Sequence, residues 1–130
     1  MTKFNSCQLP PPLKPGDLLK VISPSGALRE FEALEKGIDI WRSRGYQVEL
    51  GRNWDATEGY LAGSDRQRRQ ALQEAWLDPE CKGILCVRGG YGSARLLEDW
   101  NWQQESGKNI SMPNSPLNAI DSKWLIGFSD

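Results

Sequence analysis

The chain has 130 residues, which is the size of one domain and is long enough for a hydrophobic core. Its 38% hydrophobic and 25% charged residues are those of an ordinary soluble globular protein. A formal net charge of −1 leaves no excess of basic side chains, so nucleic acid is not expected as a partner.

Three cysteines, Cys7, Cys81 and Cys86, lack the spacing of a disulfide framework or of a metal site. Cys86 lies in an apolar run and is expected in the core. The chain has no signal-like N-terminus and no apolar stretch of about 18 residues, so we expect a cytoplasmic protein with free thiols and no membrane partner. It also has no histidine, so these residues alone cannot form a Ser–His or Cys–His pair or a histidine metal site.

The first half of the chain reads as an extended segment followed by strand, helix and strand. Four prolines predict that residues 1–16 run extended. Residues 17–22 are typical of a short buried strand, which ends at the turn formers of residues 23–26. Apolar residues at helical spacing predict a helix over about 27–44, and the alternation over 46–50 predicts a second strand.

The second half continues the same alternation. Residues 64–67 (Ser-Asp-Arg-Gln) match a capping box, in which the Ser and Gln side chains satisfy free backbone N–H groups at a helix start. The helix that follows is expected to stop at Asp78-Pro79 and to turn four residues inward, namely Ala71, Leu72, Ala75 and Trp76. Further along, the pattern predicts a strand over 83–87, a helix over 93–100 and a strand over 124–126.

This alternation predicts an α/β fold with an open, doubly wound, mainly parallel sheet, flavodoxin-like and similar to the layer of class I glutamine amidotransferases. It forms one domain over residues 17–130, in which the Ser/Asn/Pro-rich stretch 103–122 is expected to be a flexible loop. Ligands of such sheets bind beyond the carboxyl ends of the strands. The segments 23–26, 88–93 and 127–130 should all lie there.

A glycine-rich segment, Arg88-Gly89-Gly90-Tyr91-Gly92-Ser93, joins a predicted strand to a predicted helix. Its glycines allow positive φ angles and let a ligand approach bare N–H groups. A tight structural turn is the alternative interpretation. A dinucleotide site fits poorly, because Arg95 stands where the third glycine is required and the motif follows the third strand. The chain has no GKS or GKT, which excludes a Walker P-loop.

The segment Gly127-Phe128-Ser129-Asp130 follows an apolar strand. A serine on a sharp turn after a strand is the nucleophile-elbow arrangement, in which the next N–H can stabilise an oxyanion. On the tripeptide alone, an ordinary loop serine is the competing interpretation.

Other charged residues give weaker signals. The arginines at positions 66, 68 and 69 are expected to form a solvated helix face, because a short basic run is no nucleic-acid site without a wider patch. Lys20 and Lys123 could serve as the base of a Ser–Lys mechanism, although nothing in the sequence singles out either one.

Four segments, taken together and in order, resemble the LD-carboxypeptidase family, which includes the muramoyltetrapeptide carboxypeptidases and the microcin C7 self-immunity hydrolases. They are Leu13 to Asp17 with Ile22 to Gly26, Tyr60 to Asp65, Arg88 to Leu97, and Lys123 to Asp130. The resemblance spans residues 13–130. For both glycine-containing motifs, the resemblance favours a role in a hydrolase site over the alternatives of a tight structural turn and an ordinary loop serine.

The resemblance implies hydrolysis of an amide bond between an L-residue and a C-terminal D-residue, by a Ser–His–Glu triad without metal or other cofactor. By position, Ser129 matches the nucleophile. The N–H groups of Gly90 and Asp130 would form the oxyanion hole. The residues implied in substrate binding are Ser25, Arg88, Gly89 and Tyr91.

The sequence departs from the family in two respects. The stretch before the last strand is longer than usual, and the chain stops at Asp130, so we expect the C-terminal domain with the family's Glu and His to be absent. We therefore expect the N-terminal part of a murein tetrapeptide carboxypeptidase of peptidoglycan recycling, which releases terminal D-alanine when whole and is inactive in isolation. The alternatives are a microcin C7-type amidase, and a truncated remnant that acts only as a binding or assembly module. Uncovered sheet surface predicts a homodimer.

Overall fold

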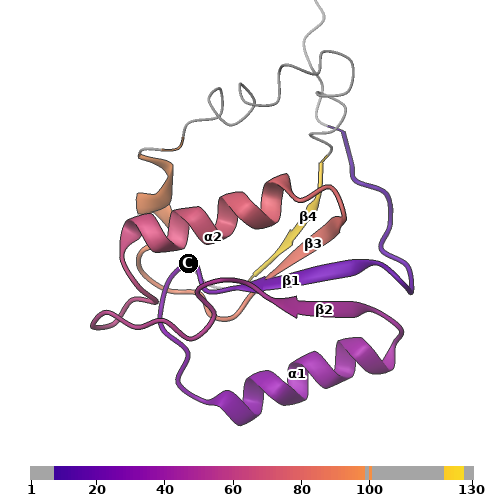
Figure 1. The fold of residues 1–130 in the computed structure, drawn as a ribbon, viewed down its shortest axis with the longest axis horizontal. Helices are drawn as coiled ribbons and strands as arrows, with labels where there is room; N and C mark the ends of the chain where they lie inside the picture. Colours follow the sequence, from indigo (N-terminus) through magenta and orange to yellow (C-terminus); the bar gives the residue numbers. More distant parts are fainter. Residues whose placement is uncertain (1–7, 99, 101–121, 128–130) are drawn as a thin grey trace, which may run out of the picture.

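A four-stranded parallel sheet forms the centre of the molecule (Figure 1). The computed structural model describes residues 8–98, 100 and 122–127. Its strands are β1 (Leu18–Ile22), β2 (Gln47–Leu50), β3 (Cys81–Cys86) and β4 (Trp124–Ile126), in the spatial order β2-β1-β3-β4. The predicted open α/β architecture with parallel central strands is confirmed.

Two helices cover opposite faces of this sheet, α1 (Phe31–Ser43) on one side and α2 (Asp65–Leu77) on the other (Figure 1). Each helix turns an apolar stripe inward, as the sequence period predicts. Under α1 the buried residues are Val21, Ile38 and Val48. Under α2 they are Ile22, Ala71, Ala75, Cys81 and Ile84, with Leu72 and Trp76 packed against them.

The start of α2 is set by the predicted capping box. The Ser64 hydroxyl accepts the Gln67 backbone N–H at 3.1 Å, and the Gln67 side chain accepts the Ser64 N–H at 2.9 Å. Two donors that the first turn of a helix leaves without partners are thereby satisfied.

The first helix begins at Phe31, four residues later than the sequence predicts. Residues 27–30 are held out of the helix because Ala27 is tied to other segments through both of its backbone groups. Its N–H donates to the Tyr60 carbonyl at 2.9 Å, and its carbonyl accepts the Arg88 guanidinium at 2.9 Å.

The third predicted helix is shorter and tighter than expected, a 3₁₀ helix η1 (Ser93–Leu97) in place of residues 93–100. The Arg69 side chain donates to the Leu96 and Arg95 carbonyls at 2.9 and 3.4 Å. These acceptors would serve later N–H groups if the segment continued as an α-helix. Only Leu96 of η1 is buried, so little apolar surface favours a longer helix.

Several predictions concern residues outside the described part of the chain. These are residues 1–7 of the predicted extended segment, and residues 103–121 of the predicted loop. Among the described helices, none is long and apolar enough to cross a membrane.

Candidate active site

The segments that follow β1, β3 and β4 meet at one edge of the sheet, because the strands are parallel and their carboxyl ends point the same way. In the β3–β4 register Leu85 pairs with Ile126, which brings Gly127 beside Cys86. A cavity of about 540 Å³ opens at this edge. Its lining includes Ser25, Arg88, Gly89, Ser93 and Gly127.

Three of the sequence-predicted site residues, Ser25, Arg88 and Gly89, therefore share one cavity. Gly90 and Tyr91 belong to the same turn but are not among the described residues that line it. Ser129 and Asp130 lie outside the described residues, so their predicted roles stay predictions.

The turn after β1 is buried and held by polar contacts. The Asn53 side-chain amide, which is 3% exposed, donates to the Ser23 carbonyl at 2.8 Å and to the Ala62 carbonyl at 3.2 Å. A hydrogen bond of 3.0 Å between the Ser25 and Ser93 hydroxyls links this turn to the glycine-rich turn. The two turns thus form a single connected wall.

Arg88 lies across this wall. Its guanidinium donates to the Ala27 carbonyl and stands 5.3 Å from the centre of the Tyr60 ring, a cation–π contact. The residue is only half-buried, so part of it still faces solvent. Arg88 therefore places a positive charge in the wall of the cavity.

Two glycines of the turn have positive φ angles, 107° at Gly90 and 120° at Gly92. L side chains rarely adopt this backbone conformation. A Cβ at Gly90 would also overlap the Tyr60 hydroxyl, and one at Gly92 would come within 2.6 Å of Leu61. The turn therefore needs glycine for its backbone angles and for the close approach of residues 60 and 61.

Arg68 is the residue that sequence reasoning placed wrongly. The expectation of a solvated basic face fails here, because Arg68 is 0% exposed, while Arg66 is exposed and Arg69 half-buried. A signal was available: position 68 precedes Ala71 and Ala75 at helical spacing, so it lies on the buried stripe of α2. The charge is tolerated because each nitrogen of the guanidinium donates a hydrogen bond and Nη2 is paired with the Asp65 carboxylate.

The electrostatics of the site are set by burial and by one acidic side chain. The hydrogen bond from Arg68 lowers the pKa of Asp65, and Arg95 acts in the same direction through contacts of 3.0 Å. Burial raises the pKa of the Cys86 thiol to about 11. Cys86 is only half-buried, so the prediction that it lies in the core is wrong. Because of the raised pKa, its thiol is protonated at neutral pH and is a poor nucleophile.

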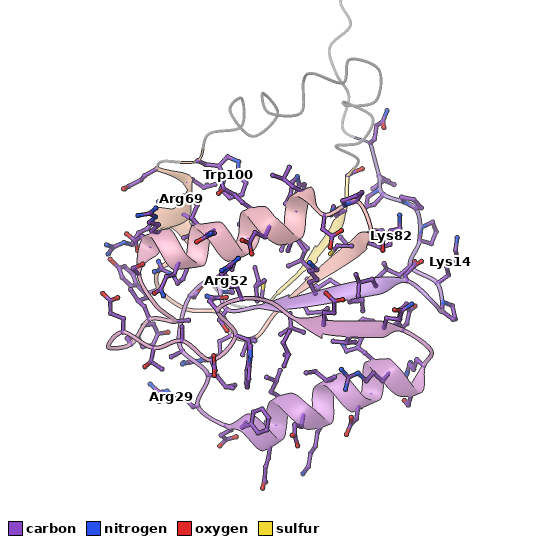
Figure 2. The ribbon with its side chains drawn as sticks, in the orientation of Figure 1. Lys14, Arg29, Arg52, Arg69, Lys82 and Trp100 are labelled. Atoms are coloured by element: carbon purple, nitrogen blue, oxygen red, sulfur yellow. The ribbon has the colours of Figure 1, made fainter. Side chains whose placement is uncertain are left out.

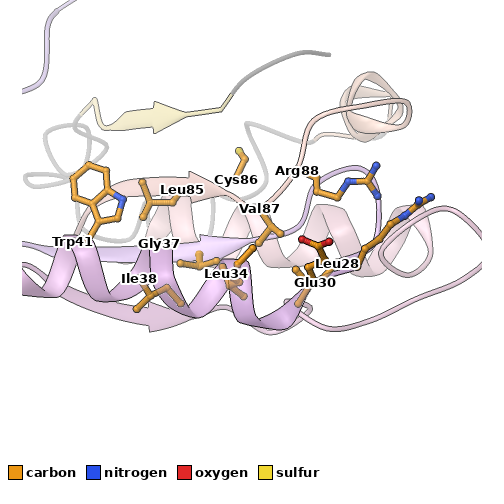
Figure 3. Close-up of a pocket in the computed structure, with 13 residues that line it drawn as sticks. Leu28, Glu30, Leu34, Gly37, Ile38, Trp41, Leu85, Cys86, Val87 and Arg88 are labelled. Atoms are coloured by element: carbon orange, nitrogen blue, oxygen red, sulfur yellow. The ribbon is translucent and has the colours of Figure 1, made fainter.

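A second cavity, of about 480 Å³, lies on the other face of the sheet, between α1 and β3 (Figure 3). The helix contributes Leu34, Ile38 and Trp41, and the strand side contributes Leu85 and Val87. Of the predicted site residues, Arg88 alone is among the described residues that line it.

Comparison with known families identifies the chain. Residues 19–130 match the family described as LD-carboxypeptidase N-terminal domain. The chain belongs to the LD-carboxypeptidase family. The match covers both glycine-containing motifs and β1 to β4, so the expectation from the sequence resemblance is confirmed at the level of the family.

Relatives of this LD-carboxypeptidase chain are longer than it is. A Synechocystis sp. protein described as "Putative carboxypeptidase slr1534" is 59% identical over 93% of this chain and 36% of its own length. The murein tetrapeptide carboxypeptidase of Pseudomonas aeruginosa is 33% identical over 85% of this chain and 32% of its own length. The chain thus spans about a third of the curated relatives it matches.

Solved structures agree on the fold. The crystal structure of an MccF-like protein from Bacillus anthracis str. Ames has a TM-score of 0.77 and 27% identity, covering 95% of this chain and 34% of its own. The microcin C7 self-immunity protein MccF, solved in complex with aspartyl sulfamoyl adenosine, has a TM-score of 0.74 over 95% of this chain and 33% of its own. At 23% identity, this second likeness shows the fold alone.

Proposed function

We propose that the chain is the nucleophile-bearing part of a serine-type murein tetrapeptide carboxypeptidase, with Ser129 as the nucleophile. The observation that supports this most is the meeting of the glycine-rich turn and Gly127 at one cavity. Gly127 precedes Ser129 by two residues, so the predicted elbow begins at a residue that shares this cavity with Gly89 of the glycine-rich turn.

In the proposed reaction the Ser129 hydroxyl attacks the carbonyl carbon of the L–D amide, and its proton passes to an imidazole base. The N–H groups of Gly90 and Asp130 would stabilise the oxyanion. The C–N bond then breaks, the terminal D-alanine leaves with that proton, and water releases the acyl group from Ser129. Because these 130 residues contain no histidine, the proposed imidazole base comes from sequence outside them.

The proposed substrate is a peptidoglycan-derived peptide, met in the cytoplasm during recycling. The similarity to the murein tetrapeptide carboxypeptidase of Pseudomonas aeruginosa supports this choice. Ser25, Arg88, Gly89 and Tyr91 are proposed to bind it, with the Arg88 guanidinium suited to a carboxylate. The mechanism uses no metal or cofactor.

A microcin C7-type amidase is the second candidate. It is favoured by the structural likeness to the MccF-like protein of Bacillus anthracis, the relative with 27% identity and a TM-score of 0.77. Both candidates use the same nucleophile and oxyanion hole, so they differ only in the substrate. Turnover of an aminoacyl sulfamoyl nucleoside, with no release of D-alanine from a tetrapeptide, would favour this second candidate.

The nucleophile is tested by Ser129→Ala in the full-length protein. We expect D-alanine release from a murein tetrapeptide to fall by at least about 10⁴-fold, because no other group can form the acyl-enzyme. Ser43→Ala, on the exposed surface of α1, serves as the matched control and should keep normal turnover. A near-normal kcat in Ser129→Ala would show that Ser129 is not the nucleophile. The purified 130-residue chain alone is expected to release no D-alanine.

A further inference from the structure

Arg68 ties together three separate segments around the candidate site. Its guanidinium donates from Nε to the Pro24 carbonyl at 3.0 Å, from Nη1 to the Gly63 carbonyl at 3.2 Å and from Nη2 to the Gly92 carbonyl at 2.9 Å. Pro24 lies in the turn after β1, Gly63 precedes α2, and Gly92 ends the glycine-rich turn. The carboxylate of Asp65 holds the same Nη2 at 2.8 Å.

The glycine-rich turn is therefore fixed at both ends. At its beginning, the Val87 N–H donates to the Ile22 carbonyl at 2.9 Å, which continues the sheet. At its end, the Gly92 carbonyl accepts two hydrogen bonds, one from the Arg68 side chain at 2.9 Å and one from the Arg95 backbone N–H at 3.2 Å. Between these points lie Gly89 and Gly90, which have no side chains of their own to fix their peptides.

Peptide geometry links the anchored carbonyl to the site. The C=O and N–H of a trans peptide point in opposite directions, so a Gly92 carbonyl directed at Arg68 turns the Ser93 N–H away from it. The Ser93 hydroxyl is in turn bonded to Ser25 in the wall of the cavity. Loss of the Arg68 contact would leave this carbonyl with the weaker of its two donors, the Arg95 N–H at 3.2 Å. The turn that carries the Gly90 N–H would then be held less firmly at its end.

We propose that Arg68 is a positioning residue, which acts through the Gly92 carbonyl to hold the glycine-rich turn in the orientation that the oxyanion hole needs. This inference rests on the proposed function, since it assigns Arg68 a part in the same reaction. Arg68 is fully buried under the turn and is not expected to touch substrate. The guanidinium suits the task because its rigid planar fork directs three nitrogens at carbonyls in three separate segments, whereas an ammonium donates from a single nitrogen.

The test compares Arg68→Met and Arg68→Lys in the full-length protein, with kcat and KM measured on a murein tetrapeptide and kcat expressed per folded molecule. We expect Arg68→Met to lower kcat by about 10- to 100-fold with KM changed less than about threefold, because a displaced turn weakens transition-state contacts more than substrate binding. Arg68→Lys keeps the charge but can reach fewer carbonyls, so its kcat should lie between those of Arg68→Met and the wild type.

Arg69→Met is the matched control. Arg69 follows Arg68 on α2 and lies beside η1 (Figure 2). It also donates to carbonyls, but these belong to η1 and not to the glycine-rich turn. Its kcat per folded molecule should stay within about threefold of the wild type. If Arg68→Met and Arg68→Lys behave like Arg69→Met, with lower stability but normal kcat, Arg68 is merely structural and the inference is wrong.

Amide hydrogen exchange at residues 89–93 supplies a readout that does not depend on activity. In Arg68→Lys, which is the variant more certain to fold, these amides should exchange at least about tenfold faster while those of β1 keep their protection. Unchanged exchange would overturn the inference even if Arg68→Met cannot be purified. If the wild type does not cleave tetrapeptide at all, the proposed function fails, and exchange alone decides whether Arg68 holds the turn.

Discussion

At the scale of single residues, the candidate site depends on a contact between a glycine and an aromatic ring. Gly90 has a φ of 107°, and the Tyr60 hydroxyl occupies the space that a side chain there would need. The Tyr60 ring is in turn covered by the Arg88 guanidinium. A side chain at position 90 would therefore disturb both the backbone of the turn and the position of Arg88.

We expect Gly90→Ala to destabilise the chain by about 2–3 kcal/mol, of which about 1–2 kcal/mol is the strain of a positive φ. Gly16→Ala isolates that strain, because Gly16 has a φ of 99° and open space around its Cα. The additional loss in Gly90→Ala relative to Gly16→Ala should shrink when Tyr60→Phe is added, since the overlapping hydroxyl is gone. Urea unfolding of these three variants and of Tyr60→Phe alone checks this. Equal losses in Gly90→Ala and Gly16→Ala would mean that the Tyr60 contact is unimportant.

At the scale of elements, α2 is joined to the sheet through its C-terminal end. Asp78, the residue after the helix, forms a 2.8 Å ion pair with Lys20 of β1, and its carbonyl accepts the Lys123 ammonium at 2.5 Å. Lys123 also donates to the Ala75 carbonyl at 3.2 Å and directly precedes β4. The C-terminal end of α2 thus contacts both β1 and the residue before β4. Burial of the Lys123 ammonium at this point lowers the pKa of Lys123.

This joint predicts a pH-dependent stability. The hydrogen bond from Lys20 lowers the pKa of Asp78, so the stabilisation is present above the unfolded value of about 3.9 and is lost as pH falls below it. At pH 7 we expect Asp78→Asn to destabilise the chain by about 1 kcal/mol. The difference from the wild type should shrink below about pH 4. Urea unfolding at pH 7 and pH 3 measures this, with Asp39→Asn on the exposed surface of α1 as the control. A difference that is the same at both pH values would contradict it.

At the scale of the whole molecule, apolar surface remains uncovered on the described chain. Leu97, Leu125 and Ile126 are 60%, 54% and 37% exposed, and they lie on η1 and β4. Among the described strands β4 is an outer one, and outer strands with exposed apolar residues favour association. The cavity between α1 and β3 adds apolar surface on the other face.

We therefore predict that the purified 130-residue chain is a dimer in solution, in which this surface packs between copies. Light scattering should give twice the chain mass of 14.6 kDa. Leu125→Lys should shift the chain toward monomer, because a charge on the edge strand opposes pairing. The matched control is Ile40→Lys, at a 56% exposed position on α1 that should leave the dimer intact. A monodisperse monomer for the unmodified chain would contradict the prediction.

Local sequence patterns determined the order and type of the elements. The strand at 124–126 and the capping box at 64–67 are found where the sequence predicts them, because a hydrophobic period and a cap depend on residues only a few positions apart. The two glycine-containing motifs could likewise be assigned to the carboxyl edge from their places after strands. Ser129 itself lies outside the described residues, so its role still rests on sequence and family.

Contacts between distant segments decided the rest. Arg68 looks like a surface arginine in the sequence, and its burial is made favourable by the carbonyls of Pro24, Gly63 and Gly92 together with the carboxylate of Asp65. Arg69 likewise shortens η1 through carbonyls some 26 and 27 residues away. A charge can be buried only where partners converge on it, and that convergence exists only once the strands have paired and the turns have met.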